Sequence, residues 1–254
     1  MRIDQGDGAD GTEGADGADG ADGADGADGP ALSDRPAPSD GAARTEQVLA
    51  YRSEAHAIYR AYAIDQGCAE VEKIETDTTT PAMLRIEAED PDRRLVGFEN
   101  RLKGKDRLAE KIENWMTAQP GLTPDDAFRL AKDAIRYSFV YEEAKYTAGV
   151  HADCDRMRSA GFEPADRRNS WADDQYKGIN GRWREPGSGL LFEVQFHTQD
   201  SYDAKQVTHA SYERIRDPST PPGEVKQLRA FQREVCATIP IPPGATEIPD
   251  YNHL

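Results

Sequence analysis

Three short stretches of the chain hold residue types that handle phosphate and divalent metal. In RLKGKDRLAEK at 101–111, a turn entering a helix carries five basic side chains: Arg101, Lys103, Lys105, Arg107 and Lys111. Free backbone N–H groups and the helix dipole add to such side chains in binding anions. The pattern is typical of a phosphate cradle, although an exposed helix with intermixed charges has the same composition.

Acidic and polar side chains occur on two predicted strands. Asp133 and Arg136 lie at the start of the apolar run DAIRYSFVY, and in FEVQFHT at 192–198 strand alternation puts Glu193, Gln195 and His197 on one face. Two acids on separate strands can hold Mg²⁺, which takes carboxylate oxygens together with substrate phosphate oxygens. The alternative is that these residues are only the solvated face of a hairpin and a surface acid.

Taken together, the three stretches favour phosphoryl or pyrophosphoryl transfer. Such reactions need mainly positioning of the substrate and neutralisation of its charge. A basic cradle and two acids supply both.

The elements that must position these residues follow from local patterns. Thr123 and Pro124 are a strong helix start, and Gly161 is a natural helix end. Helices are predicted at 45–66, 105–117, 123–132, 143–160, 200–215 and 223–237. Strands are predicted at 81–88, 94–98, 133–141 and 162–171, and the runs 177–184 and 190–197 flank a Gly-rich turn as a hairpin. This mixture predicts an α+β fold, a mixed β-sheet flanked by helices.

Composition divides the chain into three segments. Residues 1–44, which include a Gly-Ala-Asp repeat, hold ten Asp, one Glu and three Arg, and so carry half of the formal charge of −16. They are predicted to be a disordered acidic tail and linker, with weak calcium binding as the functional alternative. Residues 45–240 are predicted to be the folded domain, and the Pro-rich segment 241–254 is expected to be extended.

Charge and cysteine content exclude several functional classes. An acidic protein does not bind nucleic acid through its bulk charge, so DNA is not an expected partner. Three widely spaced Cys without a CxxC or CxxH spacing indicate neither a disulfide framework nor structural zinc. No apolar run approaches the length of a membrane span, and the N-terminus lacks the features of a secretory signal. We expect the site of action to be cytoplasmic; export by a route independent of such a signal stays compatible with the sequence.

The chain resembles the RelA/SpoT family of pyrophosphokinases over about residues 95–215. The family's basic motif is similar to Arg101-Leu102-Lys103-Gly104 with Lys111, its Asp-containing strand to 133–137, and its E-V-Q-I-R-T to Glu193–Thr198. Its acceptor loop is similar to 176–180. The combination looks like the stand-alone and toxin-type members, and residues 45–240 would be the synthetase domain.

The resemblance implies a role for each residue. Asp133 and Glu193 would be the catalytic acids and hold Mg²⁺, with Glu193 alternatively taking the proton from the attacking 3′-hydroxyl. ATP, the donor, would be bound by residues of the basic motif and the Asp-containing strand: Arg101, Lys103, Arg107, Lys111 and Arg136. The acceptor would be bound by Tyr176, Lys177, Asn180, Gln195 and His197.

Departures from the family pattern leave the acceptor open. Asp133 and Arg136 are two residues closer than usual, His197 replaces an arginine, and Ile179 stands where a tyrosine stacks on the acceptor guanine. Tyr176 or Trp171 would have to substitute. The expected reaction moves the β,γ-pyrophosphate of ATP to the 3′-hydroxyl of a purine nucleotide, giving (p)ppApp or (p)ppGpp-type alarmones. Alternatives are pyrophosphorylation of a tRNA 3′ end and a non-catalytic nucleotide-binding module; for a toxin, an immunity protein is the expected partner.

Overall fold

The computed structural model describes residues 40–253, and the chain divides into two compact units, residues 1–49 and 50–254. Of the first unit, residues 40–49 are described; they are helical, and the Thr45 hydroxyl donates to the Gly41 carbonyl at 2.8 Å. The prediction of a disordered tail therefore falls mostly outside the described residues. Helix α1 (Asp40–Ile74) begins inside the range predicted as linker.

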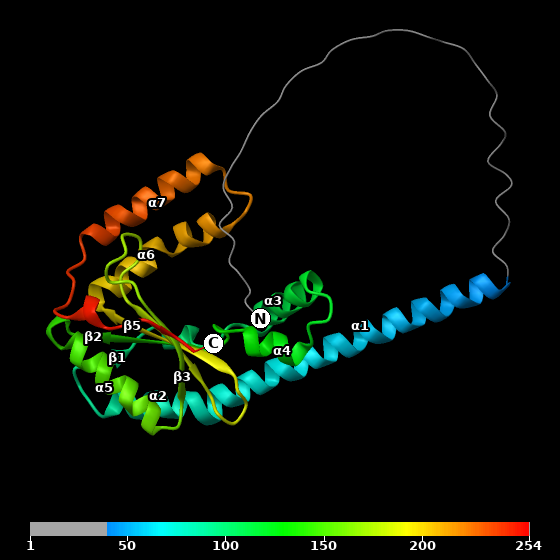
Figure 1. Cartoon of the computed structure of the whole chain (residues 1–254), viewed down its shortest axis with the longest axis horizontal. Helices are drawn as coiled ribbons and strands as arrows, with labels where there is room; N and C mark the ends of the chain where they lie inside the picture. Colours follow the sequence, from blue (N-terminus) through cyan, green and yellow to red (C-terminus); the bar gives the residue numbers. More distant parts are fainter. Residues whose placement is uncertain (1–39, 254) are drawn as a thin grey trace, which may run out of the picture. The chain divides into compact units, whose positions relative to one another are not determined.

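A mixed six-stranded sheet is the centre of residues 50–254 (Figure 1). Its strands lie in the order β1 (Arg93–Leu95), β2 (Arg136–Tyr141), β5 (Leu191–Thr198), β4 (Ile179–Arg184), β3 (Glu163–Asn169) and β6 (Tyr251–Asn252). Strands β2 and β5 are parallel, whereas the other named pairs are antiparallel. The predicted mixed α+β class is confirmed.

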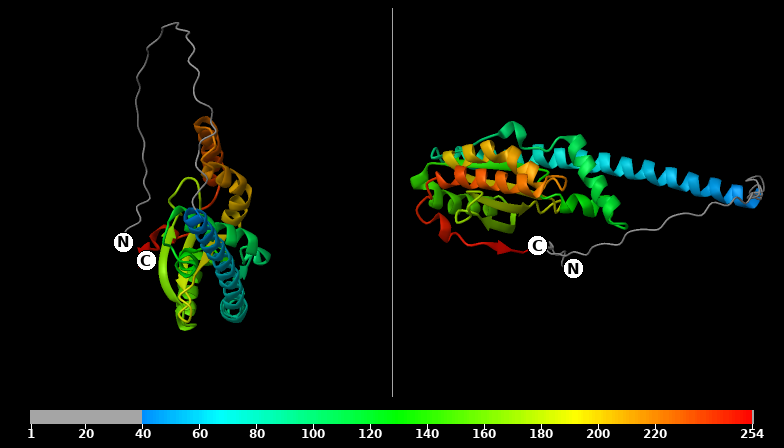
Figure 2. Two further views of the ribbon diagram at one scale, coloured as in Figure 1. Left: turned by 90° about the vertical axis from the view of Figure 1, so that its right-hand side faces the viewer. Right: turned by 90° about the horizontal axis from the view of Figure 1, so that it is seen from above.

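Helices cover both faces of this sheet (Figures 1 and 2). On one side lie α2 (Thr80–Ala88) and α5 (Tyr146–Ser159), which contact each other and the strands. On the other side α6 (Gln199–Arg216) contacts β2 and β5 and pairs with α7 (Pro222–Ala237). Helices α3 (Lys105–Ala118) and α4 (Pro124–Leu130) contact each other and precede β2. This arrangement leaves β5 buried along its whole length.

An aromatic cluster fills the side of the sheet that faces α5. Phe192 and Phe196 of β5 are fully buried, as is Phe139 of β2. Phe162 meets Phe192 edge to face at 4.9 Å between ring centroids, and the Tyr146 hydroxyl donates to the Phe196 carbonyl at 2.9 Å. Large aromatic side chains contribute much of a core's apolar area, so this cluster holds the strand that carries Glu193 firmly in register.

Several predicted elements are confirmed, together with the residues at the helix ends that predicted them. Helix α4 begins after Thr123, whose Oγ1 accepts from the Asp126 N–H at 3.2 Å, with Pro124 in the first turn. Helix α5 ends before Gly161, which has a φ of 95°. The predicted hairpin is formed by β4 and β5, and α3, α6 and α7 fall where helices were expected.

Three predictions differ from the structure. The predicted strand at 81–88 is wrong, because this segment is helix α2; Pro81 lies in its first turn, and Ala82, Met83 and Ile86 are buried on one helical face. The C-terminal segment is not simply extended: it makes a short 3-10 turn (Ala245–Glu247) and strand β6. Helix α1 runs beyond the predicted 45–66, and large apolar side chains on it, such as Ile58 and Tyr62, are exposed.

No described helix combines the length and apolarity needed to cross a membrane. Cys68, Cys154 and Cys236 are buried free thiols, consistent with the absence of a disulfide framework expected from their spacing.

Candidate functional site

Backbone hydrogen bonds bring the basic motif beside the start of β2. The Lys103 N–H donates to the Ala134 carbonyl at 2.9 Å, and the Arg136 N–H donates to the Arg101 carbonyl at 2.7 Å. Residues 101–103 thereby run alongside 134–136. Two of the predicted stretches, about thirty residues apart in the chain, become one surface.

Arg136 joins the two predicted catalytic acids. It is the direct register partner of Glu193 on the parallel strands β2 and β5, and its Nε lies 3.0 Å from Glu193 Oε2. Its Nη2 lies 3.8 Å from Asp133 Oδ2. Burial lowers the pKa of Arg136, but Glu193 and, to a smaller extent, Asp133 raise it, and the net pKa lies above its usual value, so the guanidinium stays charged.

Asp133 is held by two lysines of the basic motif. Lys103 Nζ lies 3.2 Å from Asp133 Oδ2, and Lys111 Nζ is ion-paired with Oδ1. Burial alone would raise the pKa of Asp133, but Lys111 and Lys103 together lower it to about 2. The carboxylate is therefore ionised at any physiological pH.

The polar face of β5 is buried and hydrogen-bonded, so the alternative of a solvated hairpin face is wrong. Glu193, Gln195 and His197 are 9%, 5% and 0% exposed. Gln195 Nε2 donates to Glu193 Oε1 at 2.7 Å, and the Ser138 hydroxyl donates to Gln195 Oε1 at 3.3 Å. Buried polar groups that are hydrogen-bonded in this way fix side-chain geometry.

Lys205 of α6 completes this network. Its Nζ donates to Gln195 Oε1. Burial is the main cause that lowers its pKa to about 8, and the nearby Arg136 lowers it further, against the opposing effect of Glu193. Lys205 is not among the predicted site residues, because its only signal in the sequence is a basic residue on a predicted helix after FEVQFHT.

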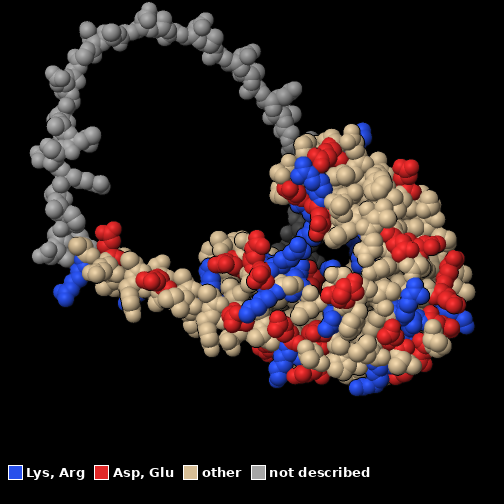
Figure 3. Space-filling view, turned by 180° about the vertical axis from the view of Figure 1, so that it is seen from behind, with Lys and Arg blue, Asp and Glu red and all other residues tan. Residues whose placement is uncertain are grey.

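Several of these groups, but not Glu193 or Gln195, line a cavity of about 420 Å³. It is lined by β2, the basic motif and α6, including Lys103, Arg107, Asp133, Arg136 and Lys205. Figure 3 shows Lys and Arg side chains gathered beside a hollow on one face of the chain, although the formal charge is −16. A concave site with convergent charged groups of shifted pKa is the usual form of a ligand site.

Arg101 is fixed by residues that the sequence did not single out. Its guanidinium lies 4.2 Å from the centroid of the Phe98 ring, and its Nε donates to Glu75 Oε1 at 2.7 Å. Glu75 is 3% exposed and begins a π-helical turn, Glu75–Thr79, between α1 and α2. Such turns are common near functional sites, but nothing in the sequence around residue 75 predicts one.

The predicted acceptor residues form a separate hydrogen-bonded group. The Tyr176 hydroxyl donates to Asn180 Oδ1 at 2.9 Å and lies 3.0 Å from His197 Nε2, while His197 Nδ1 lies 2.9 Å from the Ser201 hydroxyl. Burial, and next Lys205, lower the pKa of His197 to about 3, so the ring is neutral. A neutral His197 does not carry the positive charge of the arginine that it replaces in the family pattern, and its Nε2 contacts the Tyr176 hydroxyl.

Other candidates at the acceptor loop have internal roles. Lys177 Nζ donates to the carbonyls of Trp171 and Asp173 at 2.9 and 2.6 Å, which closes the loop. Trp171 and Ile179 are fully buried, so Trp171 cannot substitute for the missing stacking tyrosine. Tyr176, which is half-buried, is the remaining aromatic candidate.

The donor atoms of the two acids are compatible with Mg²⁺. The described residues contain no group of three or more His, Cys, Asp or Glu arranged for a metal ion. Asp133 and Glu193 supply the hard oxygens that Mg²⁺ prefers, and one or two carboxylates suffice where substrate phosphates complete the shell. Their oxygens pair with the cations of Lys103, Lys111 and Arg136 and with the Gln195 amide. The donor set therefore fits Mg²⁺ bound together with a polyphosphate that engages the three cations.

No family model and no curated protein matches the sequence. Solved structures do resemble it. A GTP pyrophosphokinase family protein from Streptococcus pneumoniae is 13% identical over 73% of this chain and 88% of its own, with a TM-score of 0.41. Small alarmone synthetase 1 from Bacillus subtilis, solved with its product pppGpp, is 16% identical over 78% and 96%, also with a TM-score of 0.41. A Streptococcus mutans UA159 protein is 12% identical over 73% and 92%, with a TM-score of 0.42. At these values the function has to be argued from the geometry of the site itself.

Proposed function

We propose that the chain is a pyrophosphokinase that moves the β,γ-pyrophosphate of ATP to the 3′-hydroxyl of a purine nucleotide. The observation that carries the proposal is the cluster of Asp133, Arg136, Lys103 and Lys205 at the wall of one cavity, with Glu193 paired to Arg136 directly behind it. Two acidic side chains among several cations match a magnesium-bound polyphosphate better than any neutral substrate.

The reaction would be an in-line substitution at the β-phosphorus. The 3′-oxygen of the acceptor forms a bond to that phosphorus while the bond from phosphorus to the α–β bridging oxygen breaks, and AMP leaves with that oxygen. Lys103, Arg107 and Lys111 would hold the phosphates, and Arg101 and Arg136 would flank the adenine. Lys205 would add a charge near the transferred group.

Asp133 and Glu193 would hold Mg²⁺, which supplies neutralisation of phosphate charge when bound. Glu193 is alternatively the proton acceptor for the 3′-hydroxyl. On the acceptor side, Gln195 is placed by Glu193, Ser138 and Lys205, and Tyr176 by Asn180 and His197. Preorganised groups of this kind cost little reorganisation during transfer.

The proposal is tested by incubating the chain with Mg²⁺ and ATP labelled in the β-phosphate, with ATP, ADP, GTP, GDP or deacylated tRNA as acceptor. Mass spectrometry should find a nucleotide heavier by one pyrophosphate together with AMP. Product on tRNA alone would show that the acceptor is an RNA 3′ end and not a nucleotide. Release of AMP with none of these acceptors modified would refute the proposal.

A further inference from the structure

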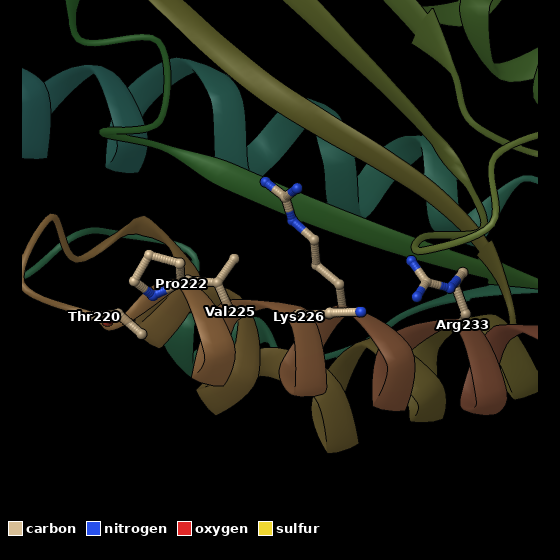
Figure 4. A pocket seen from close by; sticks show the side chains of 6 residues that line it. Thr220, Pro222, Val225, Lys226 and Arg233 are labelled. Atoms are coloured by element: carbon tan, nitrogen blue, oxygen red, sulfur yellow. The ribbon is translucent and has the colours of Figure 1, made fainter. Parts of the chain in front are cut away.

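A second cavity, of about 510 Å³, lies along helix α7. Its lining consists of Thr220, Pro222, Val225, Lys226, Arg229 and Arg233. It shares no lining residue with the cavity that contains Asp133 and Arg136. Figure 4 shows its labelled side chains set along α7. The second cavity is therefore a separate feature of the surface.

Three cations lie on one face of α7. Lys226, Arg229 and Arg233 are spaced three and four residues apart, which places them within about 60° of one another around the helix axis and along about 10 Å of its length. All three are exposed. We call this set the α7 basic face.

The charge of this face is largely uncompensated. Within residues 40–253 no carboxylate lies within 4.0 Å of Lys226 or Arg229, and Arg233 meets Asp174 only at that limit. Glu224, the acid in the first turn of α7, is instead paired with Arg214 of α6 at 2.7 and 3.1 Å. In a chain with 47 acidic and 31 basic residues, a row of cations without acidic partners forms a local positive potential that attracts anions.

We propose that the α7 basic face binds the 5′-polyphosphate chain of a nucleotide, at a site separate from the cavity at Asp133. Its length suits several linked phosphates better than a single one, since the cations extend over about two helical turns. Pro222 and Val225 offer an apolar surface at one end for the base or sugar. The volume is within the range of about 300–1,000 Å³ usual for small-molecule sites, and the net charge of −16 opposes an extended RNA contact.

The site goes beyond the proposed transfer reaction and does not require it. The ion pair of Arg233 with Asp174 places one end of the face next to the loop that carries Tyr176. A polyphosphate bound there would compete with Asp174 for Arg233. The bound nucleotide is thus positioned to affect the acceptor loop.

The test is calorimetric titration of the full chain with α,β-methylene ATP, in which the scissile linkage cannot break. The wild-type chain should bind two equivalents. Replacing Lys226, Arg229 and Arg233 together by Gln should leave one, or weaken the second by about tenfold or more, because charge-assisted contacts to phosphate are lost. A control replaces three exposed cations elsewhere, Arg52, Lys73 and Arg85, by Gln, and should still bind two.

Thermal unfolding of both triple variants would show whether the fold is retained; exposed substitutions should leave it unchanged. Inorganic tripolyphosphate should displace the second equivalent from the wild-type chain. Three results would each overturn the proposal. They are binding of only one equivalent by the wild-type chain, binding of two equivalents by the α7 variant with unchanged affinity, and binding of RNA but not of nucleotides at this face. Two equivalents without any transfer activity would refute the proposed function and leave this site standing.

Discussion

Removing the Glu75 carboxylate should weaken ATP binding through Arg101, although neither Glu75 nor Arg101 is among the residues that line the cavity. The contact between Glu75 Oε1 and Arg101 Nε is 2.7 Å, and the two side chains are 4% and 29% exposed. A hydrogen bond between charged groups contributes about 1.5–3 kcal/mol, and the partial exposure of Arg101 places this one toward the lower end. Arg101 would keep its contact with Phe98 but lose its fixed direction.

The expected result for Glu75→Ala is a KM for ATP higher by roughly five- to thirtyfold, which corresponds to one or two kcal/mol, with a smaller change in kcat. Glu75→Gln, which keeps an oxygen acceptor, should fall between Glu75→Ala and the wild-type chain. Initial rates over a range of ATP concentrations measure both constants. Glu72→Gln, an exposed change in the preceding turn, is the matched control and should have no effect.

Loss of structure could imitate the same result, so unfolding in urea is measured on each variant. A Glu75→Ala chain that is folded and has an unchanged KM for ATP, while Arg101→Ala raises it, would show that Arg101 does not depend on Glu75. The proposed positioning role would then be wrong.

Two other predictions concern pH and backbone conformation. Because the pKa of Lys205 is lowered to about 8, its charge is present below that pH and lost above it, so the KM for ATP should rise up to about tenfold from pH 7 to pH 9. In Lys205→Arg, which stays charged, the KM should not change over this pH range. The same rise in that variant would show that Lys205 is not the group whose titration changes the KM. Gly178 has a φ of 144°, and a Cβ there would lie 2.8 Å from the His197 ring, so Gly178→Ala should lower stability by about 1 kcal/mol or more in urea unfolding. Gly223→Ala, in open space on α7 with no such φ, is the control and should not destabilise; equal midpoints for the two variants would contradict the steric argument.

Much of the fold was predictable because its signals are local. The cap at Thr123, the helix end at Gly161 and the alternation in FEVQFHT each depend on neighbouring residues, and the structure contains the corresponding elements. The segment 81–88 was not predictable in this way. A short apolar run fits a strand or a helix equally, and burial of Met83 and Ile86 against the rest of the fold decides for the helix.

The candidate site was predictable only in part, for a related reason. Asp133, Glu193 and the basic motif stand out by residue type, and β2 and β5 bring them together. The partners that fix them come from distant elements: Glu75 from the turn after α1, and Lys205 from α6. Their roles depend on contacts across 26 and 10 residues, which no local pattern encodes.

The most direct test of the central claim is transfer of labelled β-phosphate from ATP to a purine nucleotide by the wild-type chain, Asp133→Asn and Glu193→Gln. Each substitution keeps the size of the side chain and removes the charge. We expect product with the wild-type chain, losses of about a hundredfold or more in both variants, and full activity in Glu163→Gln, an exposed change on β3. Transfer at the wild-type rate by either site variant would contradict the central claim.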